Sequence, residues 1–522
     1  MLCVLSSEPA LPAEKTDSFD VVVIGGTPGG VAAAVTAARL GHSVALVEYH
    51  RHLGGMSSSG LGKSDIEHRE MIQGFFKEFV ERIKAHYQSD PKNFKLCRDG
   101  YFYEPSVAES IFDSFVKEQP SLSLFRHQQI EVVSTSRESQ SADRIETVKV
   151  SDRDTEEKHV FRAKVFIDAT YEGDVYAAAG AEFRLGRESR ADFGEPHAGH
   201  VYLDWRGKRA MTGTGLGDDR LPAYTYRLCL TTDPQNAASL TAPPPEYNRK
   251  NYLGYLDDLN SGRFGKNANL TRIAFSISPI PNQKTDVNMN PRGLGFVFVG
   301  ENKGYVDISL AERERISTHL RNLTLGLLWF LQNDEEVPAN ARELARQHQL
   351  CRDEFADNDN FPFQLYVREA RRLVGEYTLS ERNITVQSGI TSELVHPDAI
   401  AVGEFPVDSF PVEKRQPNDD AVLEGYMCML SGITRPYQIP YRIMIPKKLD
   451  GLIVPVAAST THVAFSSIRL EPTWMAMGQA AGIAAHLAVS KNLLPRQVPI
   501  DELQKLLRQQ GAVIDLPENP RR

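Results

Sequence analysis

Residues 19–48 read FDVVVIGGTPGGVAAAVTAARLGHSVALVE, and this stretch decides the fold. Phe19–Ile24 is an apolar, β-branched run of strand length, Pro28–Leu40 is alanine-rich with helical spacing, and Ser43–Val47 is a second apolar run. Neither run alternates with polar residues, which is typical of parallel strands that are covered on both faces. The pattern predicts a β-α-β unit within an internal parallel sheet.

The turn between the first strand and the helix has the glycine spacing of a dinucleotide-binding site. Gly25 supplies a tight turn, Gly30 lets the helix approach the strand, and the N–H groups at the start of the helix face a diphosphate. Thr27 takes the usual place of the second glycine; we expect it to cap the helix, with Pro28 at the first helical position. The predicted phosphate-binding residues are Gly25, Gly26, Thr27, Pro28, Gly29 and Gly30. The alternative is a strand-to-helix turn with a purely structural role.

Glu48 ends the second predicted strand at the spacing where an acidic side chain accepts hydrogen bonds from the adenosine ribose. A carboxylate at this point disfavours the 2′-phosphate of NADP. The alternative is a solvated strand end. We expect Glu48 to bind ribose.

Three later segments favour a flavin over a nicotinamide dinucleotide. Residues 53–60 read LGGMSSSG, where the glycines let the backbone pass along the pyrophosphate and ribityl chain; residues 167–174 read IDATYEGD, a strand that runs into small residues. The third segment is a terminal strand, loop and alanine-rich helix, whose positive end would face a reduced flavin. Arg469 would offset flavin charge, and Glu471 would cap the helix before Pro472; the alternative for both is a structural ion pair. The cofactor-binding residues predicted here are Gly54, Gly55, Met56, Ser58, Ala169, Thr170, Ala457, Arg469, Glu471 and Pro472.

Further elements follow from hydrophobic periodicity and turn signals. They frame an irregular middle of the chain that we interpret as an insertion. The predicted elements are helices over Glu70–Tyr87, Pro105–Lys117, Leu310–Leu331 and Pro472–Val489, and strands over Ser121–Val133, Arg144–Val150, Lys158–Asp168 and Leu452–Val456. The expected divisions are a disordered or targeting tail (1–18), an FAD-binding domain in two parts (19–190 and 449–495), an inserted α+β substrate or cap domain (191–448) and a C-terminal tail (496–522).

These segments resemble the FAD-dependent oxidoreductases built like glutathione reductase. The resemblance is closer still to an uncharacterised group with GGTPGG-type turns, a GGM loop, DATYEGD and a terminal RLEPTWMAMGQAAG-type segment, some members of which are labelled putative xanthan lyases. It covers the first 190 and the last 75 residues, together with YVREARRLVGEYTL at 366–379. It implies an α/β fold with an FAD-binding Rossmann domain, a central parallel sheet and a β-meander, with FAD as the cofactor.

Candidate catalytic residues lie in the loop before the terminal helix and in the insertion. His462 could take a hydroxyl proton as hydride leaves carbon, although a lone loop histidine is usually not catalytic. Arg368 and Arg372 could clamp a carboxylate or a polyhydroxylated substrate; strand alternation would place both on one side with Glu376, and the alternative is a solvated face. The predicted function is hydride transfer between a small polar substrate, with sugar-derived compounds among the candidates, and flavin N5. The alternatives are a polysaccharide lyase acting on uronate glycans and a non-catalytic flavin-binding protein.

Composition narrows the class of partner. The formal net charge of −9 argues against nucleic acid, and five scattered cysteines without a CxxC pair argue against a metal site, an iron–sulfur cluster or a disulfide framework. The longest internal apolar run, Leu323–Leu331, is about half of a bilayer span. We therefore expect a cytoplasmic protein without a membrane span, or an exported one if the N-terminus is the remnant of a signal peptide. The sequence sets no oligomeric state.

Overall fold

The predicted β-α-β unit is present. β1 (Lys15–Ile24) pairs in parallel with β2 (Val44–Val47), Val21 lying opposite Val44, and α1 (Pro28–Arg39) joins them. The computed structural model describes residues 14–137, 142–204, 209–265, 267–387, 391–415, 422–428 and 430–516. Of the tail expected over residues 1–18, residues 1–13 lie outside the described ranges. The four residues from Lys15 instead begin β1, because they pair with β6 from His159 onward.

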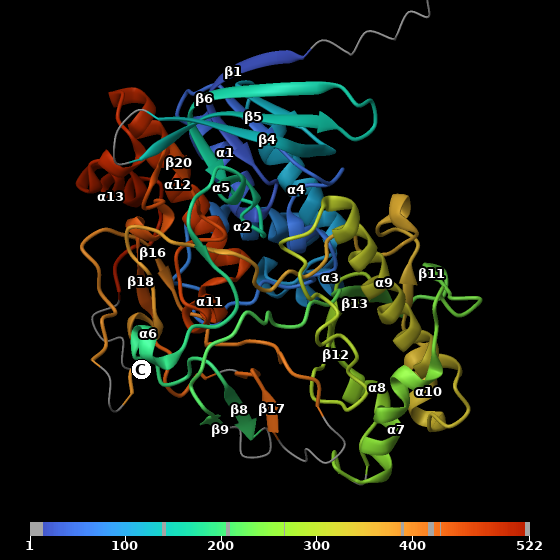
Figure 1. Ribbon diagram of the computed structural model, residues 1–522. Helices are drawn as coiled ribbons and strands as arrows, with labels where there is room; N and C mark the ends of the chain where they lie inside the picture. Colours follow the sequence, from blue (N-terminus) through green and yellow to red (C-terminus); the bar gives the residue numbers. More distant parts are fainter. Residues whose placement is uncertain are drawn as a thin grey trace, which may run out of the picture.

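The central sheet combines a parallel half with a meander (Figure 1). Its parallel strands follow the order β20, β6, β1, β2, β3, and β6 extends beyond this half into an antiparallel meander with β5 and β4. β1 and β6 are neighbours whose connections leave in opposite directions, and ligands bind beside such a point. The bounds are β3 (Leu122–Phe125), β4 (Gln128–Arg137), β5 (Asp143–Asp152), β6 (Lys158–Asp168), β19 (Leu449–Asp450) and β20 (Leu452–Ile453).

The strand predicted over Ser121–Val133 is two strands. The chain breaks after β3, where His127 has a φ of 59°, and continues as β4 in the meander. The helix predicted over Pro105–Lys117 is confirmed as α4 with the same bounds, and the one predicted from Glu70 begins later, at Phe75. The helices of this region are α2 (Phe75–Tyr87), α3 (Pro91–Leu96), α4 (Pro105–Lys117) and α5 (Asp174–Ala178).

The terminal helix α12 (Glu471–Lys491) packs closely along α1. A Cβ added at Gly478 would lie 2.0 Å from the carbonyl oxygen of Gly29, and one added at Gly482 would lie 2.5 Å from that of Ala33. The two glycines are four residues apart and so share one helix face. The C-terminal tail expected from residue 496 contains α13 (Ile500–Gln509), whose buried leucines hold it on the domain; residues 517–522 lie outside the described ranges.

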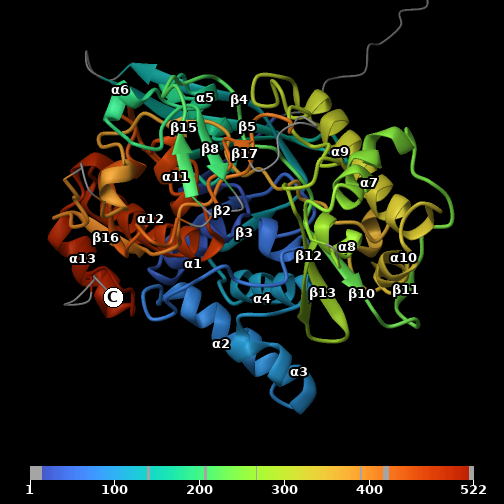
Figure 2. The same ribbon diagram turned by 90° about the horizontal axis from the view of Figure 1, so that it is seen from below.

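The described residues between 191 and 448 carry antiparallel strands and helices, as an α+β segment should. A five-stranded antiparallel sheet in the order β11, β14, β10, β13, β12 lies beside α7 to α10 (Figures 1 and 2). α9 starts at a capping box formed by Ser309 and Glu312. The helices are α6 (Arg190–Phe193), α7 (Leu253–Asn260), α8 (Leu270–Ala274), α9 (Leu310–Asn333), α10 (Ala339–Arg346) and, near the terminal helix, α11 (His462–Ile468). The remaining strands are β7 (Phe183–Arg184), β8 (Val201–Asp204), β9 (Arg209–Thr212), β10 (Leu228–Thr231), β11 (Ala237–Ala238), β12 (Phe275–Ile280), β13 (Lys284–Met289), β14 (Gln349–Cys351), β15 (Arg372–Leu373), β16 (Ala399–Gly403), β17 (Val422–Glu424) and β18 (Tyr437–Pro440).

Candidate functional site

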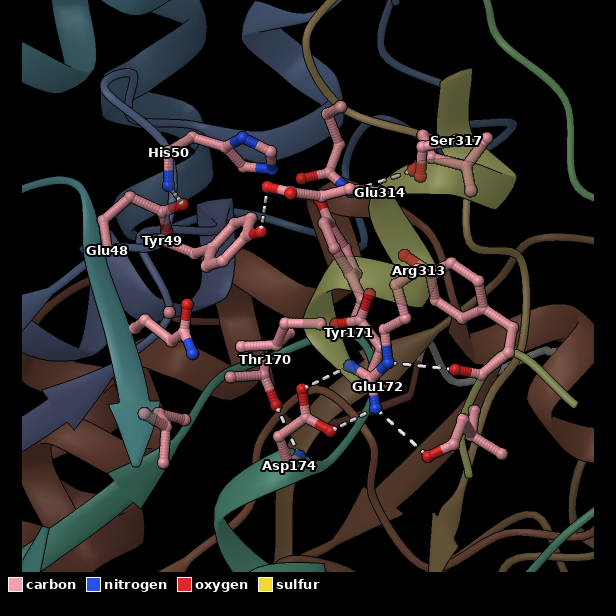
Figure 3. A pocket seen from close by; sticks show the side chains of 18 of the residues that line it. Glu48, Tyr49, His50, Thr170, Tyr171, Glu172, Asp174, Arg313, Glu314 and Ser317 are labelled. Atoms are coloured by element: carbon pink, nitrogen blue, oxygen red, sulfur yellow. Dashed lines mark hydrogen bonds and ion pairs between the residues drawn. The ribbon is translucent and has the colours of Figure 1, made fainter. Parts of the chain in front are cut away.

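A cavity of about 970 Å³ opens where β1, β2 and β6 end. Its inner wall is formed by the ends of these strands and the meander, and its outer wall by α9 and residues 358–365 (Figure 3). The volume lies at the upper end of the range of small-molecule sites. Four of the predicted cofactor-binding residues line it: Gly25, Thr27, Glu48 and Thr170.

The glycine turn has the geometry that the sequence predicts. The Thr27 hydroxyl accepts a hydrogen bond from the Gly30 amide at 3.2 Å and donates one to the Ala169 carbonyl at 2.9 Å, so Thr27 caps α1 and also joins β1 to β6. Gly25 has a φ of 103°, and a Cβ there would lie 2.6 Å from the Ala169 carbonyl. A Cβ on Gly30 would lie 1.8 Å from the Gly25 carbonyl oxygen. Only glycine fits these two places.

Glu48 faces both the cavity and the glycine turn. Its Oε2 accepts from the Gly26 amide at 2.5 Å, and its Oε1 accepts from the His50 amide at 2.7 Å. Burial raises the pKa of Glu48 to about 7, although these amides oppose the shift. The carboxyl is therefore held rigidly where ribose hydroxyls would meet it.

The GGM loop lies behind the cavity wall, because Tyr171 stands in front of it. The Met56 amide donates to the Tyr171 hydroxyl at 3.1 Å, and the Gly54 amide donates to the Gly26 carbonyl at 2.7 Å. Ser58 bonds the Leu53 carbonyl. Gly54, Gly55, Met56 and Ser58 are thus fixed against the phosphate-binding turn, but none of them lines the cavity in this structure.

The start of α12 lies on the other side of Tyr171, whose ring packs against Trp474 with centroids 5.3 Å apart. α12 begins at Glu471 after an N-cap at Leu470, so Pro472 is the second helical residue, one later than predicted. Glu471 does not cap the helix, because neither carboxyl oxygen has a hydrogen-bond partner among the described residues. Burial raises the pKa of Glu471 to about 7. Ala457, Arg469, Glu471 and Pro472 are all buried outside the cavity.

His462 is the first residue of α11, not a loop residue, because Thr461 caps the helix immediately before it. Its Nδ1 lies 2.7 Å from Oε2 of Glu369, and its amide donates to Glu188 at 2.8 Å. Its Nε2 is buried and has no partner among the described residues.

Arg372 lies beneath this pair. It forms ion pairs with Glu188 at 2.6 Å and with Glu369 at 2.9 Å, and it donates to the Thr460 carbonyl at 3.0 Å. Its side chain is 0 % exposed, which excludes the solvated-face interpretation. Arg372 therefore fixes both carboxylates that contact His462.

Arg368 and Arg372 do not share one side of a strand. β15 contains only Arg372 and Leu373, so the alternation predicted through Glu376 does not occur. Arg368 instead bonds the Ala223 carbonyl at 3.0 Å and the Thr225 hydroxyl at 2.9 Å. The two arginines therefore hold different groups.

The outer wall is fastened by charged groups that the sequence did not single out. Arg313 of α9 contacts both oxygens of Asp174, at 2.7 and 2.9 Å, and Tyr49 donates to Glu314 at 2.8 Å (Figure 3). Burial raises the pKa of Glu172, beside them, to about 7. The helix was predicted, but its partners lie far away in the sequence, so periodicity could not reveal them.

Two of the free cysteines also lie close together. Cys229 on β10 and Cys351 on β14 have sulfurs 3.9 Å apart, without a disulfide. In the part of the chain that the structure describes, no group of three or more His, Cys, Asp or Glu side chains is arranged to hold a metal, and no helix is long and apolar enough to cross a membrane.

The sequence profile of the FAD-dependent oxidoreductases matches residues 20–507, which is nearly the whole chain. The chain belongs to this family. FAD is therefore its cofactor, and the glycine turn with Glu48 fits the adenosine and diphosphate half of that molecule. The resemblance drawn from GGTPGG, GGM and DATYEGD is confirmed.

Individual relatives are distant or match only locally. An NADH oxidase of Thermoanaerobacter brockii is 50 % identical over 64 residues, which are 12 % of this chain and 9 % of that protein. Among solved structures, a geranylgeranyl bacteriochlorophyll reductase-like protein of Thermoplasma acidophilum matches at 12 % identity over 95 % of this chain and 84 % of its own, with a TM-score of 0.35. A glycerol-3-phosphate dehydrogenase of Bacillus halodurans complexed with FAD matches at 16 % identity over 36 % and 40 %, with a TM-score of 0.22.

Proposed function

We propose that this oxidoreductase oxidises a small polar substrate, with sugar-derived compounds among the candidates, by hydride transfer to FAD. The observation that carries the proposal is the buried pair of His462 and Glu369, in which one imidazole nitrogen is bonded and the other has no partner. FAD, when bound, supplies the hydride acceptor at N5. We assign residues 191–448 to the substrate domain because they contribute Glu369 and Arg368.

His462 would act as the proton acceptor. A carboxylate accepts hydrogen bonds only, so in the neutral imidazole the Nδ1 that contacts Glu369 would carry the ring proton and Nε2 would keep a lone pair. A substrate hydroxyl at Nε2 would give up its proton there as hydride leaves the carbon. Glu369 would stabilise the imidazolium that forms.

Arg372 acts as a positioning residue. Its polar contacts are with Glu188, Glu369 and the carbonyls of Gly186 and Thr460, and the two carboxylates are those that hold His462. Arg368 has unpartnered nitrogens and is the substrate contact.

The cofactor would be held by both chain ends. Glu48 would accept from the ribose hydroxyls, and the first turn of α1 would meet the diphosphate, where the helix dipole favours negative charge. The GGM loop and residues 457–472 would adjoin the ribityl chain and the flavin ring. Tyr171 contacts Met56 of the GGM loop through its hydroxyl and Trp474 of α12 through its ring.

Anaerobic titration of the purified holoprotein tests the proposal. A panel of polyols, aldoses, sugar acids and 2-hydroxy acids is added, and loss of the visible flavin absorption band is recorded. We expect at least one class to reduce the flavin in wild type and the His462→Asn variant to lose this reduction. A flavin that stays oxidised with every compound would favour the non-catalytic alternative, and formation of an unsaturated uronate from a glycan would favour the lyase. Reoxidation by oxygen or by an artificial acceptor then separates an oxidase from a dehydrogenase.

A further inference from the structure

Arg368 is held rigidly in the interior. Its side chain is among the largest that are fully enclosed, and Nη1 is occupied by the Ala223 carbonyl and the Thr225 hydroxyl. The guanidinium lies over the ring of Phe410, 3.5 Å from its centroid, and 4.1 Å from the centroid of Tyr366. Its planar group therefore has a fixed orientation.

Arg368 differs from the other buried arginines of the described chain in its charge balance. Each of the others has a carboxylate oxygen within 4.0 Å: Arg187, Arg227, Arg313, Arg371, Arg372, Arg415 and Arg469. Arg368 forms no such ion pair within the described residues, and its Nε and Nη2 have no hydrogen-bond partner there. A buried cation without a counter-ion is unfavourable, so a functional explanation is required.

The unpartnered nitrogens form the edge of the guanidinium that binds carboxylates elsewhere in this protein. Arg187 holds Asp218 through Nε and Nη2 at 3.0 and 2.6 Å, and Arg227 holds Asp286 through the same two atoms at 2.6 and 2.8 Å. These two parallel N–H groups match the spacing of carboxylate oxygens. The same edge of Arg368 is therefore built to take a planar anion.

Neighbouring groups do not neutralise this edge. Asp408, the acid that most affects Arg368, lies 3.7 Å from Arg469 and pairs with that residue. Burial raises the pKa of Asp408 to about 6, so this carboxyl is still mostly ionised near neutral pH, but its ion pair is with Arg469 and not with Arg368. Burial also lowers the pKa of Arg368 to about 9, so the guanidinium remains a cation at neutral pH.

The segments that hold Arg368 also form the cavity wall. Leu365 and Tyr226 line the cavity, and the segments that carry them are joined by the Tyr366 amide, which donates to the Thr225 carbonyl at 2.9 Å. Arg368, which bonds the Thr225 hydroxyl, therefore belongs to the same pair of segments, although it does not itself line the cavity.

We propose that the substrate is a small carboxylate and that Nε and Nη2 of Arg368 bind its carboxylate group bidentately. This inference rests on the proposed function only in calling the bound molecule the substrate. It narrows the substrate class from polar compounds in general to organic acids such as uronic, aldonic or 2-hydroxy acids.

Binding of acids and their amides to the holoprotein tests this inference without turnover. The probes are D-glucuronate with D-glucuronamide, lactate with lactamide, and propionate with propionamide, the last pair having no hydroxyl group to oxidise. Affinity is measured by calorimetry and by perturbation of the flavin spectrum in wild type, Arg368→Gln, Arg368→Lys and the control Arg442→Gln. Arg442 holds Asp398 through the same edge at a half-exposed site.

We expect at least one acid to bind wild type and Arg442→Gln at least about tenfold more tightly than its amide. Arg368→Gln should lose this preference. Arg368→Lys should keep only part of it, because lysine keeps the charge but lacks the two parallel N–H groups. Equal binding of acids and amides, unchanged acid binding by Arg368→Gln, or no binding of any acid would overturn the inference. Hydroxy acids that bind through Arg368, none of which reduces the flavin, would support the inference and contradict the proposed function. Flavin reduction by neutral polyols that is insensitive to Arg368→Gln would support the proposed function and contradict the inference.

Discussion

Nδ1 of His462 lies 2.7 Å from Oε2 of Glu369, and each side chain is only 2 % exposed. In such a buried pair the carboxylate fixes both the tautomer and the orientation of the imidazole ring. The two residues are far apart in the sequence, and the proposed proton transfer depends on their contact.

Glu369→Gln should therefore lower the rate of flavin reduction by roughly 10²- to 10⁴-fold, the usual contribution of a positioned base. The glutamine keeps a hydrogen bond but loses the charge that stabilises the imidazolium. Stopped-flow reduction with a substrate from the anaerobic panel measures the rate. Glu376→Gln, which removes one of the two acidic partners of Arg496 and lies outside this pair, is the control. A Glu369→Gln variant as fast as wild type would show that His462 needs no carboxylate.

Binding of FAD to the apoprotein should depend on pH through Glu48. Burial raises the pKa of this carboxyl from 4.5 to about 7, and ribose hydroxyls donate to its ionised form. Affinity should thus rise about tenfold between pH 6 and pH 7–8 and then level off, whereas Glu48→Gln should be weaker and independent of pH over this range. Fluorescence titration measures the affinity for FAD, and Glu81→Gln, a substitution at an exposed residue, is the control.

The same carboxyl predicts the opposite trend for stability of the apoprotein. Between pH 4.5 and about 7 the folded chain holds a proton that the unfolded chain releases. Its contribution is therefore fully present below pH 4.5 and is lost as the pH rises through 7. Denaturant unfolding of the apoprotein should show this contribution in wild type and not in Glu48→Gln.

Thr27→Glu should give a colourless protein. The longer acidic side chain would enter the cavity at the diphosphate position and lose the bonds to Gly30 and Ala169. Thr27→Ser keeps the cap and should retain FAD. The ratio of flavin to protein absorbance after purification measures both variants, and a fully yellow Thr27→Glu protein would refute the placement of the diphosphate.

Gly478→Ala should destabilise the FAD domain by about 1–3 kcal/mol, because its Cβ would lie 2.0 Å from the Gly29 carbonyl oxygen and force α1 and α12 apart. Loss of FAD should accompany the lower melting temperature, since Gly29 belongs to the phosphate-binding turn. Gly432→Ala, where nothing lies within 4 Å of the new Cβ, is the matched control. Equal melting temperatures for the two variants would contradict the tight contact.

The sequence predicted the elements whose determinants are local. The glycine turn, the Thr27 cap, helix α4 and the meander depend on residue types at short spacing, and they are present as expected. The break at His127 was missed because a left-handed histidine leaves no mark in hydrophobic periodicity.

The candidate site was harder to predict, because its contacts join distant segments. Glu369 was not among the predicted site residues, because its contact with His462 arises only in the fold. Arg313 carries no motif, and Tyr171 was quoted only as part of IDATYEGD, yet Arg313 fastens α9 to Asp174 and Tyr171 packs against Trp474. Arg368 was noticed for its charge, but its missing counter-ion could be recognised only against the paired arginines around it.

The interlock of α12 with α1 also determines when the holoprotein can mature. β1 and α1 leave the ribosome early, whereas β20 and α12 are translated after the whole insertion. At about 5–20 residues per second, α1 is made roughly 20 seconds to a minute and a half before α12 is complete. The nascent chain must therefore be kept from aggregating over this interval, and flavin loading is a late, post-translational event.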